Sequence, residues 1–456
     1  MAAAAPDDGG MTATAAVPAP RTTYRSVFAV GQFRVLCASM FLYVLGFEFE
    51  ILGLSVVVYA QTRSAFLAAL AFAMGFGPQA IGGALFTSLA DRLPPRAVIT
   101  GGMLLRAVPG VLIGLAPGLP GAAMLVLVAL AAMIAPVFSA AVSRMLPDVL
   151  DGDRYVLGRS VLSLTAAGTQ IVGLGLGGAV LAVLSGRWLL LSAGCALVLA
   201  AFARLGLRPS AADAGVPADA APPGPSSAPS AGPSSGPSAG PARTATRGAV
   251  RATLAGNAEL LADRRVRMLL LAQWLPGMFV AGAESLIVPY TESLGRPAAA
   301  ASPLLAAVPA GMLAGDVVIG RFCRPAMRRR LVFPLALLTG APLLVLILHP
   351  AWLVVATALF SCGLGFGYQL GIQQAFLDSL PEGLRGQGFG LLSTGLMGGQ
   401  GVTPPLAGAV AAVAGPAAAM AAAGAATVLA TCCLRHSLAA RQLAPSPASP
   451  SRIPAS

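Results

Sequence analysis

Lysine is absent from this chain of 456 residues, and charged residues of all kinds make up only 10% of it. A soluble domain carries roughly 25% charged residues. Hydrophobic residues account for 56% of the chain, and the mean hydropathy is +0.80. Because no aqueous fold hides that much apolar surface, the composition excludes a set of soluble domains. It predicts an all-α integral membrane protein.

Histidine and cysteine are scarce, with two and six residues, and the cysteines show no CxxC spacing. This pattern argues against a metal centre and against a disulfide framework. The chain also lacks a GxxxxGK[ST] loop, which excludes an ATP-driven pump built from this chain alone. It has no Ser/His/Asp set and no cofactor-binding loop. We therefore expect no enzymatic activity, no cofactor and no metal site.

All 29 basic residues are arginines, and they lie in short loops between apolar segments, without the continuous basic face that a nucleic-acid partner needs. Twenty-five of them fall on one side of the predicted bilayer. Arg63, Arg187 and Arg296 fall on the other side, and Arg106 lies within a span. Positively charged loops stay in the cytoplasm. We therefore expect a multi-pass protein of the cell inner (plasma) membrane with both termini cytoplasmic.

A spanning helix needs about 20 apolar residues. This length criterion, together with breaks at charges and at Gly/Pro turns, predicts six transmembrane helices in each half of the chain. Those of the first half are expected near 35–60, 65–90, 97–116, 120–143, 157–184 and 187–206. Those of the second half are expected near 267–291, 299–321, 330–348, 351–376, 385–413 and 416–435.

The two halves repeat each other at a spacing of 230 residues. Without a gap, that shift superimposes identical residues over a long stretch: Asp148, Leu150, Gly158, Leu162, Ser163, Gly168, Gln170, Val172, Leu176, Gly178, Ala179 and Val180 match Asp378, Leu380, Gly388, Leu392, Ser393, Gly398, Gln400, Val402, Leu406, Gly408, Ala409 and Val410. A duplicated apolar half is a known way of building a membrane transporter.

A Pro/Ser/Gly-rich segment separates the two repeats and has the composition of a flexible linker. The predicted organisation has five parts: a disordered cytoplasmic tail over 1–29, a six-helix bundle over 30–207, a disordered cytoplasmic linker over 208–250, a second six-helix bundle over 251–437, and a disordered cytoplasmic tail over 438–456.

The loop between the second and third predicted helices carries a recognisable pattern. Residues 87–96 are Thr-Ser-Leu-Ala-Asp-Arg-Leu-Pro-Pro-Arg, and the equivalent loop of the second half has Gly315-Asp316 followed by Gly320-Arg321. The first loop resembles the Gly-x-x-x-Asp-Arg-x-Gly-Arg-Arg signature of the major facilitator superfamily, with Thr87, Pro94 and Pro95 as departures. The stretches VLGRSVLSL and LRGQGFGLLSTGLMGGQG resemble bacterial drug-efflux members. The resemblance covers roughly residues 30–206 and 260–436.

That resemblance implies a parallel pseudo-repeat of two bundles around a central site, and a cytoplasmic gate formed by charged loop residues. It assigns the gate to Asp91, Arg92 and Arg96, and we expect a gate or a structural salt bridge at Asp316 and Arg321. Alternatively, these are solvated charges that only orient the chain.

The run Gly173, Gly175, Gly177 and Gly178 resembles a glycine motif of proton-antiporting exporters but lacks its proline. Glycines at this density are equally expected as helix-packing contacts. The arginine that such exporters commonly carry in their fourth helix is absent here until Arg144.

Four acids and one base lie within the predicted spans, where ionisable residues are costly and mark functional sites; one of the acids is Asp316, in the lower part of its helix. At 1.5 Å rise per residue, Glu48 and Glu50 lie about 21 and 24 Å along their helix from Arg34. On the same arithmetic Glu284 lies about 25 Å from Arg267, and Arg106 about 15 Å from Arg96. Carboxyl groups from both halves thus reach similar depth, which predicts a proton-coupling site or substrate cavity between them.

Glu48 and Glu50 are about 200° apart around a helix, so they cannot both face one cavity. Glu50 shares its face with Gly46, Gly53 and Val57, a stripe suited to a cavity or to a close contact. We expect Glu50 to face the cavity and Glu48 to pair elsewhere, with one of the two bound to Arg106. A second interpretation stays open, in which the acids are only structural.

The favoured function is a secondary active transporter that exports small hydrophobic or cationic compounds, such as drugs or secondary metabolites, in exchange for protons. Its expected partners are the small-molecule substrate, protons and the lipid bilayer, and the expected state is a monomer. An uptake permease for a nutrient or metabolite is the main alternative. A non-transporting membrane scaffold or sensor is less favoured, because the linker and tails contain no recognisable domain.

Overall fold

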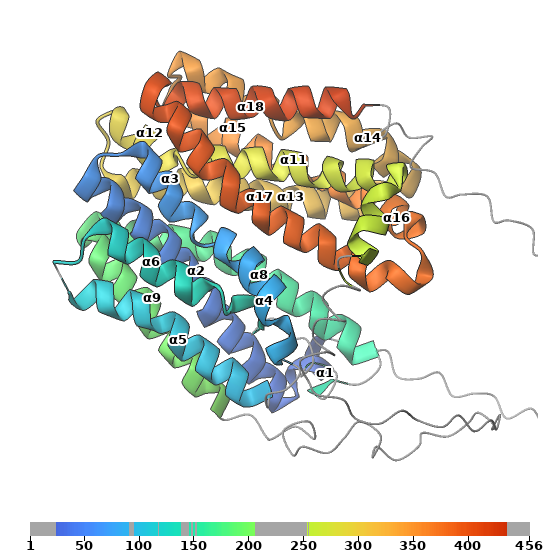
Figure 1. Cartoon of the computed structure of the whole chain (residues 1–456), viewed down its shortest axis with the longest axis horizontal. Coiled ribbons are helices and arrows are strands. Elements are labelled where there is room, and N and C mark those ends of the chain that lie inside the picture. The colour runs from blue at the N-terminus through green and yellow to red at the C-terminus, as the bar shows by residue number, and fades with distance from the viewer. Residues whose placement is uncertain are drawn as a thin grey trace, which may run out of the picture.

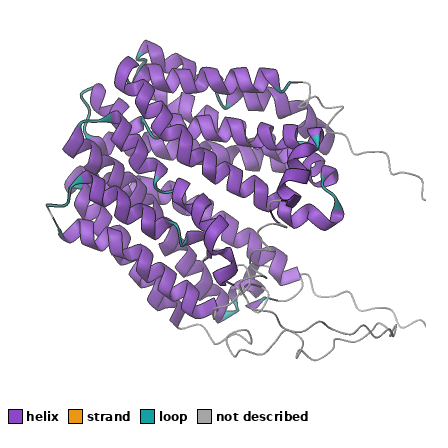
Figure 2. Cartoon of the chain, viewed as in Figure 1, coloured by secondary structure: helices purple, strands orange, loops and turns teal. Residues whose placement is uncertain are grey.

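Helices make up nearly all of the ordered secondary structure. A computed structural model describes residues 24–90, 95–116, 118–137, 146, 149–150, 153–205, 253 and 255–435, and no strand occurs among them. Figure 2 shows the helical content of these segments. Asp91, Arg92 and the predicted linker at 208–250 lie outside the described residues, as does the predicted tail at 438–456.

The helices of the first half follow the expected apolar ranges closely. They are α1 (Tyr24–Phe28), α2 (Gly31–Thr62), α3 (Ala65–Ala73), α4 (Gly77–Ala90), α5 (Pro95–Leu115), α6 (Gly121–Ala132), α8 (Asp153–Val183) and α9 (Gly186–Leu205). Local chemistry sets one of the boundaries. The Ser64 hydroxyl accepts a hydrogen bond from the Leu67 amide at 3.3 Å, which caps the start of α3.

The second half contains more short helices, because several of its apolar stretches are divided by turns. Its elements are α11 (Arg264–Glu284), α12 (Ile287–Ser293), η3 (Ala298–Ala300), α13 (Ala301–Phe322), α14 (Pro325–Leu338), η4 (Ala341–Leu348), α15 (Trp352–Gly365), η5 (Phe366–Tyr368), α16 (Gln369–Ser379), η6 (Glu382–Leu384), α17 (Arg385–Ala414) and α18 (Pro416–Cys433). Gly415, with φ of 85°, makes the turn between α17 and α18.

Eight helical segments of the described chain are long and apolar enough to cross a membrane. Ile99–Leu115, Gly121–Val137 and Gly186–Phe202 are shorter apolar helices. The helix α17 has 30 residues but belongs to neither group, because its composition is less apolar. The expected membrane character is therefore confirmed at the level of a multi-pass helical protein.

One expected boundary is wrong. The disordered tail predicted for 1–29 ends earlier, because Tyr24–Phe28 form α1. Val27 is fully buried, and the Phe28 ring packs edge-on against Phe33 with the ring centroids 5.7 Å apart. These apolar contacts with α2 order the segment.

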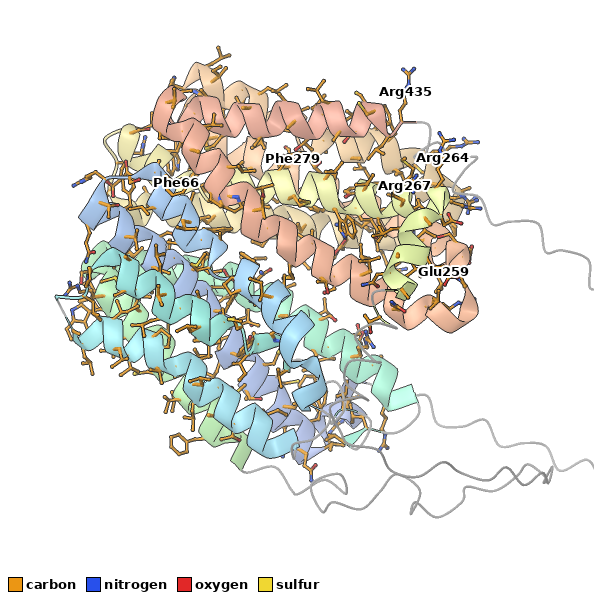
Figure 3. The ribbon with its side chains drawn as sticks, in the orientation of Figure 1. Phe66, Glu259, Arg264, Arg267, Phe279 and Arg435 are labelled. Carbon is orange, nitrogen blue, oxygen red and sulfur yellow. The ribbon has the colours of Figure 1, made fainter. Side chains whose placement is uncertain are left out.

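Figure 1 shows the first-half helices, blue to green, on one side and the second-half helices, yellow to red, on the other. The two sets approach each other at the end that carries α3 and α12, and they diverge toward the end that carries α1 and α16. Figure 3 places Arg264, Arg267 and Arg435 at the diverging end and Phe66 toward the opposite end. These three arginines, which the charge pattern assigns to the cytoplasmic side, therefore lie at the diverging end.

Contacts between the two halves involve small residues where the helices meet. A Cβ atom on Gly77 of α4 would lie 3.1 Å from the Cα of Gly401 on α17. The Ser302 hydroxyl on α13 donates to the Leu174 carbonyl on α8. Arg63 Nη1 lies 2.8 Å from Glu292 Oε2, an ion pair that joins the end of α2 to α12. Close backbone approach of this kind requires glycine or serine.

Candidate functional site

A buried ion pair lies inside the first half. Arg106 on α5 places Nη2 3.4 Å from Oε2 of Glu50 on α2, and both side chains are at most 3% exposed. Neither carboxylate oxygen and none of the guanidinium nitrogens forms a hydrogen bond with a described residue. The guanidinium instead lies over the Phe47 ring at 5.0 Å and near the Tyr43 ring at 5.9 Å. The two charges are therefore stabilised by their mutual attraction and by cation–π contacts of the guanidinium with the two rings.

The orientation of Glu50 follows from the glycines on its face. A Cβ atom on Gly46 would lie 3.1 Å from the Ala193 carbonyl oxygen, and one on Gly53 would lie 3.2 Å from the Gly186 carbonyl oxygen. Both positions face α9, so the small-residue stripe serves helix packing within the first half. The expectation that Glu50 faces the cavity is wrong, because this stripe is a close contact.

Glu48 points in a different direction, toward α8. Its Oε1 accepts a hydrogen bond from the Gln170 carboxamide at 3.1 Å. One turn further along α8, a Cβ atom on Gly173 would lie 3.2 Å from the Cβ of Glu48, so glycine leaves room for the acid. Glu48 is 6% exposed. The sequence offered a signal for Gln170, since it is one of the repeated residues, but its role as a partner of Glu48 was not foreseen.

Glu284 comes from the second half and ends α11. Its carboxyl group forms no hydrogen bond and no ion pair with a described residue. Its carboxyl group lies close enough to that of Glu48 to interact with it electrostatically, and the Cys362 thiol of α15 is within the same range. Of the two acids of α2, Glu48 is therefore the one that interacts electrostatically with Glu284.

An apolar cluster lies at the same boundary between the halves. Ile51 and Phe72 of the first half pack with Ala281 of the second, and Phe47 and Phe76 cover them. The Phe47 and Phe76 rings meet edge-on with centroids 5.7 Å apart. The Phe47 ring thus separates the Arg106 guanidinium from the interface between the halves. Glu48 follows Phe47 directly in the sequence, and Glu284 lies one turn after Ala281, so both acids lie near this cluster.

The glycine run of α8 mostly supports packing. A Cβ atom on Gly177 would lie 2.9 Å from a Leu52 methyl group, and one on Gly178 would overlap Ser302. Gly173 accommodates Glu48, and Gly175 has nothing within 4 Å of a Cβ atom. These contacts agree with the helix-packing interpretation at three of the four positions.

The structure describes only some of the predicted gate residues. Arg96 lies in the first turn of α5, and its side chain is outside the description. Asp316 is exposed on α13, and Arg321 is exposed near the end of that helix. Among the described residues these two form no ion pair, so the structural salt bridge expected there is not formed. A gating role for the five residues stays a prediction.

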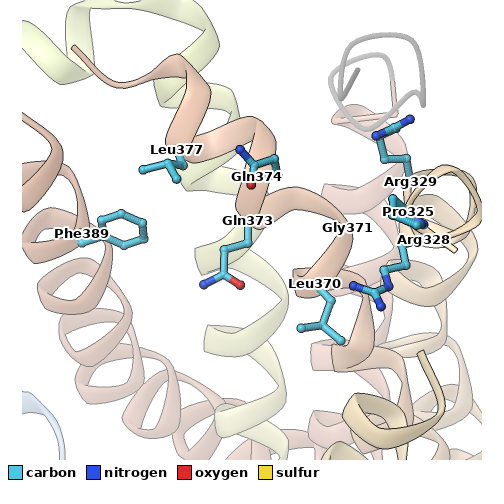
Figure 4. A pocket seen from close by; sticks show the side chains of 9 residues that line it. All are labelled: Pro325, Arg328, Arg329, Leu370, Gly371, Gln373, Gln374, Leu377 and Phe389. Carbon is cyan, nitrogen blue, oxygen red and sulfur yellow. The ribbon is translucent and has the colours of Figure 1, made fainter. Parts of the chain in front are cut away.

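A pocket of about 420 Å³ opens near the arginine-rich end of the second half. Figure 4 shows Gln373 of α16 and Phe389 of α17 directed into it, with Arg328 at its edge. The Arg328 guanidinium donates to the carbonyls of Gly320 at 2.5 Å and Cys323 at 2.9 Å, at the C-terminus of α13. This arginine is therefore occupied in capping a helix, where its charge is favourable.

Comparisons with known proteins agree with the helical arrangement. The family model described as Major Facilitator Superfamily matches residues 35–383. No curated protein matches. A bacterial homolog of the human lysosomal transporter Spinster, in an inward-facing and unoccupied conformation, is 16% identical. The alignment covers 91% of this chain and 99% of that one, with a TM-score of 0.64.

Two further solved structures are similar. A peptide transporter POT in complex with sulfate is 14% identical, with 91% of this chain and 96% of that chain covered and a TM-score of 0.65. A bacterial homologue of the iron transporter ferroportin, in an inward-facing state, is 14% identical, with 91% and 100% covered and a TM-score of 0.63. These identities show the fold alone. Since the family match spans most of the sequence, the chain belongs to the Major Facilitator Superfamily.

Proposed function

We propose that the protein is a proton-coupled exporter of small hydrophobic or cationic compounds, which works by alternating access of two six-helix halves. The observation that carries the proposal is that Glu48 and Glu284 come from different halves, lie near the cluster that joins Phe47 and Ile51 to Ala281, and interact electrostatically. Two carboxylates that interact in this way repel, and a positive charge between them removes the repulsion. A proton and a cationic substrate are alternative occupants of such a site.

Exchange follows from this competition. When the site is open to the cytoplasm, a cation displaces the proton, and when it is open to the other side, a proton displaces the cation. Arg106 does not take part, because it is bound to Glu50 behind the Phe47 ring. The cluster around Phe47, Ile51 and Phe72 is packed at the boundary in this structure. Its apolar side chains are uncovered when the halves separate and then contact the body of the compound.

Membrane placement belongs to the same proposal. Twelve spans, six in each half, place both termini on the arginine-rich side, which is the cytoplasmic side of the plasma membrane. The gate is assigned to Asp91, Arg92, Arg96, Asp316 and Arg321 at that side. The working unit is a monomer, since one chain supplies both carboxyl groups.

Transport by everted membrane vesicles tests the proposal. With a pH gradient imposed, addition of tetraphenylphosphonium should release protons from vesicles that contain the wild-type protein. Glu48→Gln and Glu284→Gln should each abolish this release, because each removes one of the two charges. Glu259→Gln, at an exposed position next to α11, is the matched control and should behave like the wild type. Proton release that persists in both Gln variants of these acids would refute proton coupling at this site.

The direction of transport is tested in whole cells. An exporter predicts higher accumulation of the cation in cells that lack the gene, and loss of the difference when a protonophore is added. Lower accumulation in the deletion strain would instead show an uptake permease.

A further inference from the structure

Gln400 on α17 is the repeat counterpart of Gln170 on α8 at the spacing of 230 residues. The packing confirms that the repeat holds here in three dimensions. Gly173 on α8 packs against Glu48 of α2, and the equivalent residue Thr403 on α17 donates a hydrogen bond to the carbonyl of Met278 on α11. Met278 is the counterpart of Glu48 at the same spacing. The helix pairs α2/α8 and α11/α17 are thus equivalent.

The two glutamines differ in their partners. Gln170 donates to Glu48 at 3.1 Å. Methionine replaces the acid in the second half, and a thioether is at best a weak acceptor. The carboxamide of Gln400 accordingly forms no hydrogen bond with any described residue; its Oε1 is shielded from solvent, whereas the residue as a whole is only partly buried. A buried acceptor without a partner is costly, so a donor from outside the chain is expected to satisfy it.

The position of Gln400 on α17 directs it away from lipid. Val402 and Leu406 are strongly exposed and mark the outer face of the helix. Gly399 packs against Met278 of α11, and Gly401 packs against Gly77 of α4 in the other half. At 100° per residue, Gln400 lies between these two contact directions and is about 160° away from Val402. It therefore faces the boundary between the halves.

We propose that Gln400 is a substrate-binding residue whose carboxamide oxygen accepts a hydrogen bond from an N–H group of a cationic substrate. This inference rests on the proposed function and narrows its substrate class. The donors Ser302 and Gln170 are already bound, to the Leu174 carbonyl and to Glu48. The groups proposed to bind the cation are acceptors: the carboxyl groups of Glu48 and Glu284 and the amide oxygen of Gln400. Such a set favours a cation that carries N–H donors over a cation of equal charge without donors.

Two permanent monovalent cations distinguish these classes. Ethidium carries two primary aryl amines, whereas tetraphenylphosphonium has no hydrogen-bond donor. Binding of each is measured on the purified full chain in detergent. Gln400→Met should weaken ethidium binding about tenfold, the value of one buried hydrogen bond, and change tetraphenylphosphonium binding less than twofold. Retained tetraphenylphosphonium binding shows that the variant is folded. The separate variant Gln400→Glu keeps an oxygen acceptor at this position, so its affinity for ethidium should not show the loss seen in Gln400→Met.

The matched control is Gln61→Met, at an exposed position near the end of α2, which should change neither affinity. Equal affinities for ethidium in the wild type and Gln400→Met, or equal losses for both cations, would overturn the inference and leave the cation exporter standing. Failure of the wild-type protein to bind either cation would refute the proposed function, and the inference with it.

Discussion

At the scale of single residues, Glu50 and Arg106 act as a unit. Their charges are almost completely withdrawn from solvent, and the described residues offer them no other ionic partner. Removal of one member of such a pair leaves an uncompensated buried charge, whereas replacement of both by apolar residues is often tolerated. We infer that this pair fixes the packing of α2 against α5 and does not carry protons.

Thermal unfolding of variants tests this role. Glu50→Leu alone should destabilise the protein by about 3–5 kcal/mol, because it strands the Arg106 charge. The double variant Glu50→Leu/Arg106→Met should recover most of that loss and keep transport activity. The measurement is the unfolding midpoint in detergent together with cation transport. A stable single variant would contradict the account, as would a double variant that folds but does not transport.

Glu48 and Glu50 of α2 show which features of the candidate site could be predicted from the sequence. Depth along a helix follows from counting residues, and so does the opposition of Glu48 and Glu50. Which of the two faces the second half depends on the rotation of α2 about its axis. Gly46 and Gly53 fix that rotation by packing on α9, and a glycine stripe suits a cavity and a helix contact equally well.

At the scale of elements, glycines control how closely helices of the two halves approach. The lengths of the apolar stretches predicted where the helices lie. Helix starts were expected near residues 65 and 416, and in the structure Ser64 and Gly415 immediately precede two helices. The divisions inside spans were not predicted, such as that between α11 and α12, because they arise from turns within continuous apolar stretches. The Gly77–Gly401 contact was not predicted either, since it pairs residues of different halves.

Substitution of Gly77 tests this contact. Gly77→Val should prevent the halves from closing at the end that carries α3 and α12, because its Cβ would press on the backbone of Gly401. Closure is measured by disulfide formation between cysteines that replace Arg63 and Glu292, in a background without native cysteines. Cross-linking should fall in Gly77→Val.

The control is Gly175→Val on α8, where nothing lies within 4 Å of a Cβ atom. Cross-linking in this variant should match the parent. Equal yields in both valine variants would show that the glycine contact does not limit closure.

At the scale of the whole molecule, the account requires an even number of crossings and a common side for the two ends. The repeat and the arginine distribution supply this expectation, and Figure 3 places Arg264, Arg267 and Arg435 together at one end of the molecule. Labelling of cysteines introduced at 5, 225 and 450 in intact cells tests it. All three should resist an impermeant thiol reagent until the membrane is opened. Labelling of one terminus alone would refute the proposed topology.

The central claim is that Glu48 and Glu284, one acid from each half, together bind a proton or a cation, but not both. The most direct measurement is proton release from the purified protein in weakly buffered detergent when tetraphenylphosphonium is added. The account predicts release by the wild type and by Glu50→Gln, and none by Glu48→Gln/Glu284→Gln. Undiminished release by that double variant, or loss of release only in Glu50→Gln, would contradict it.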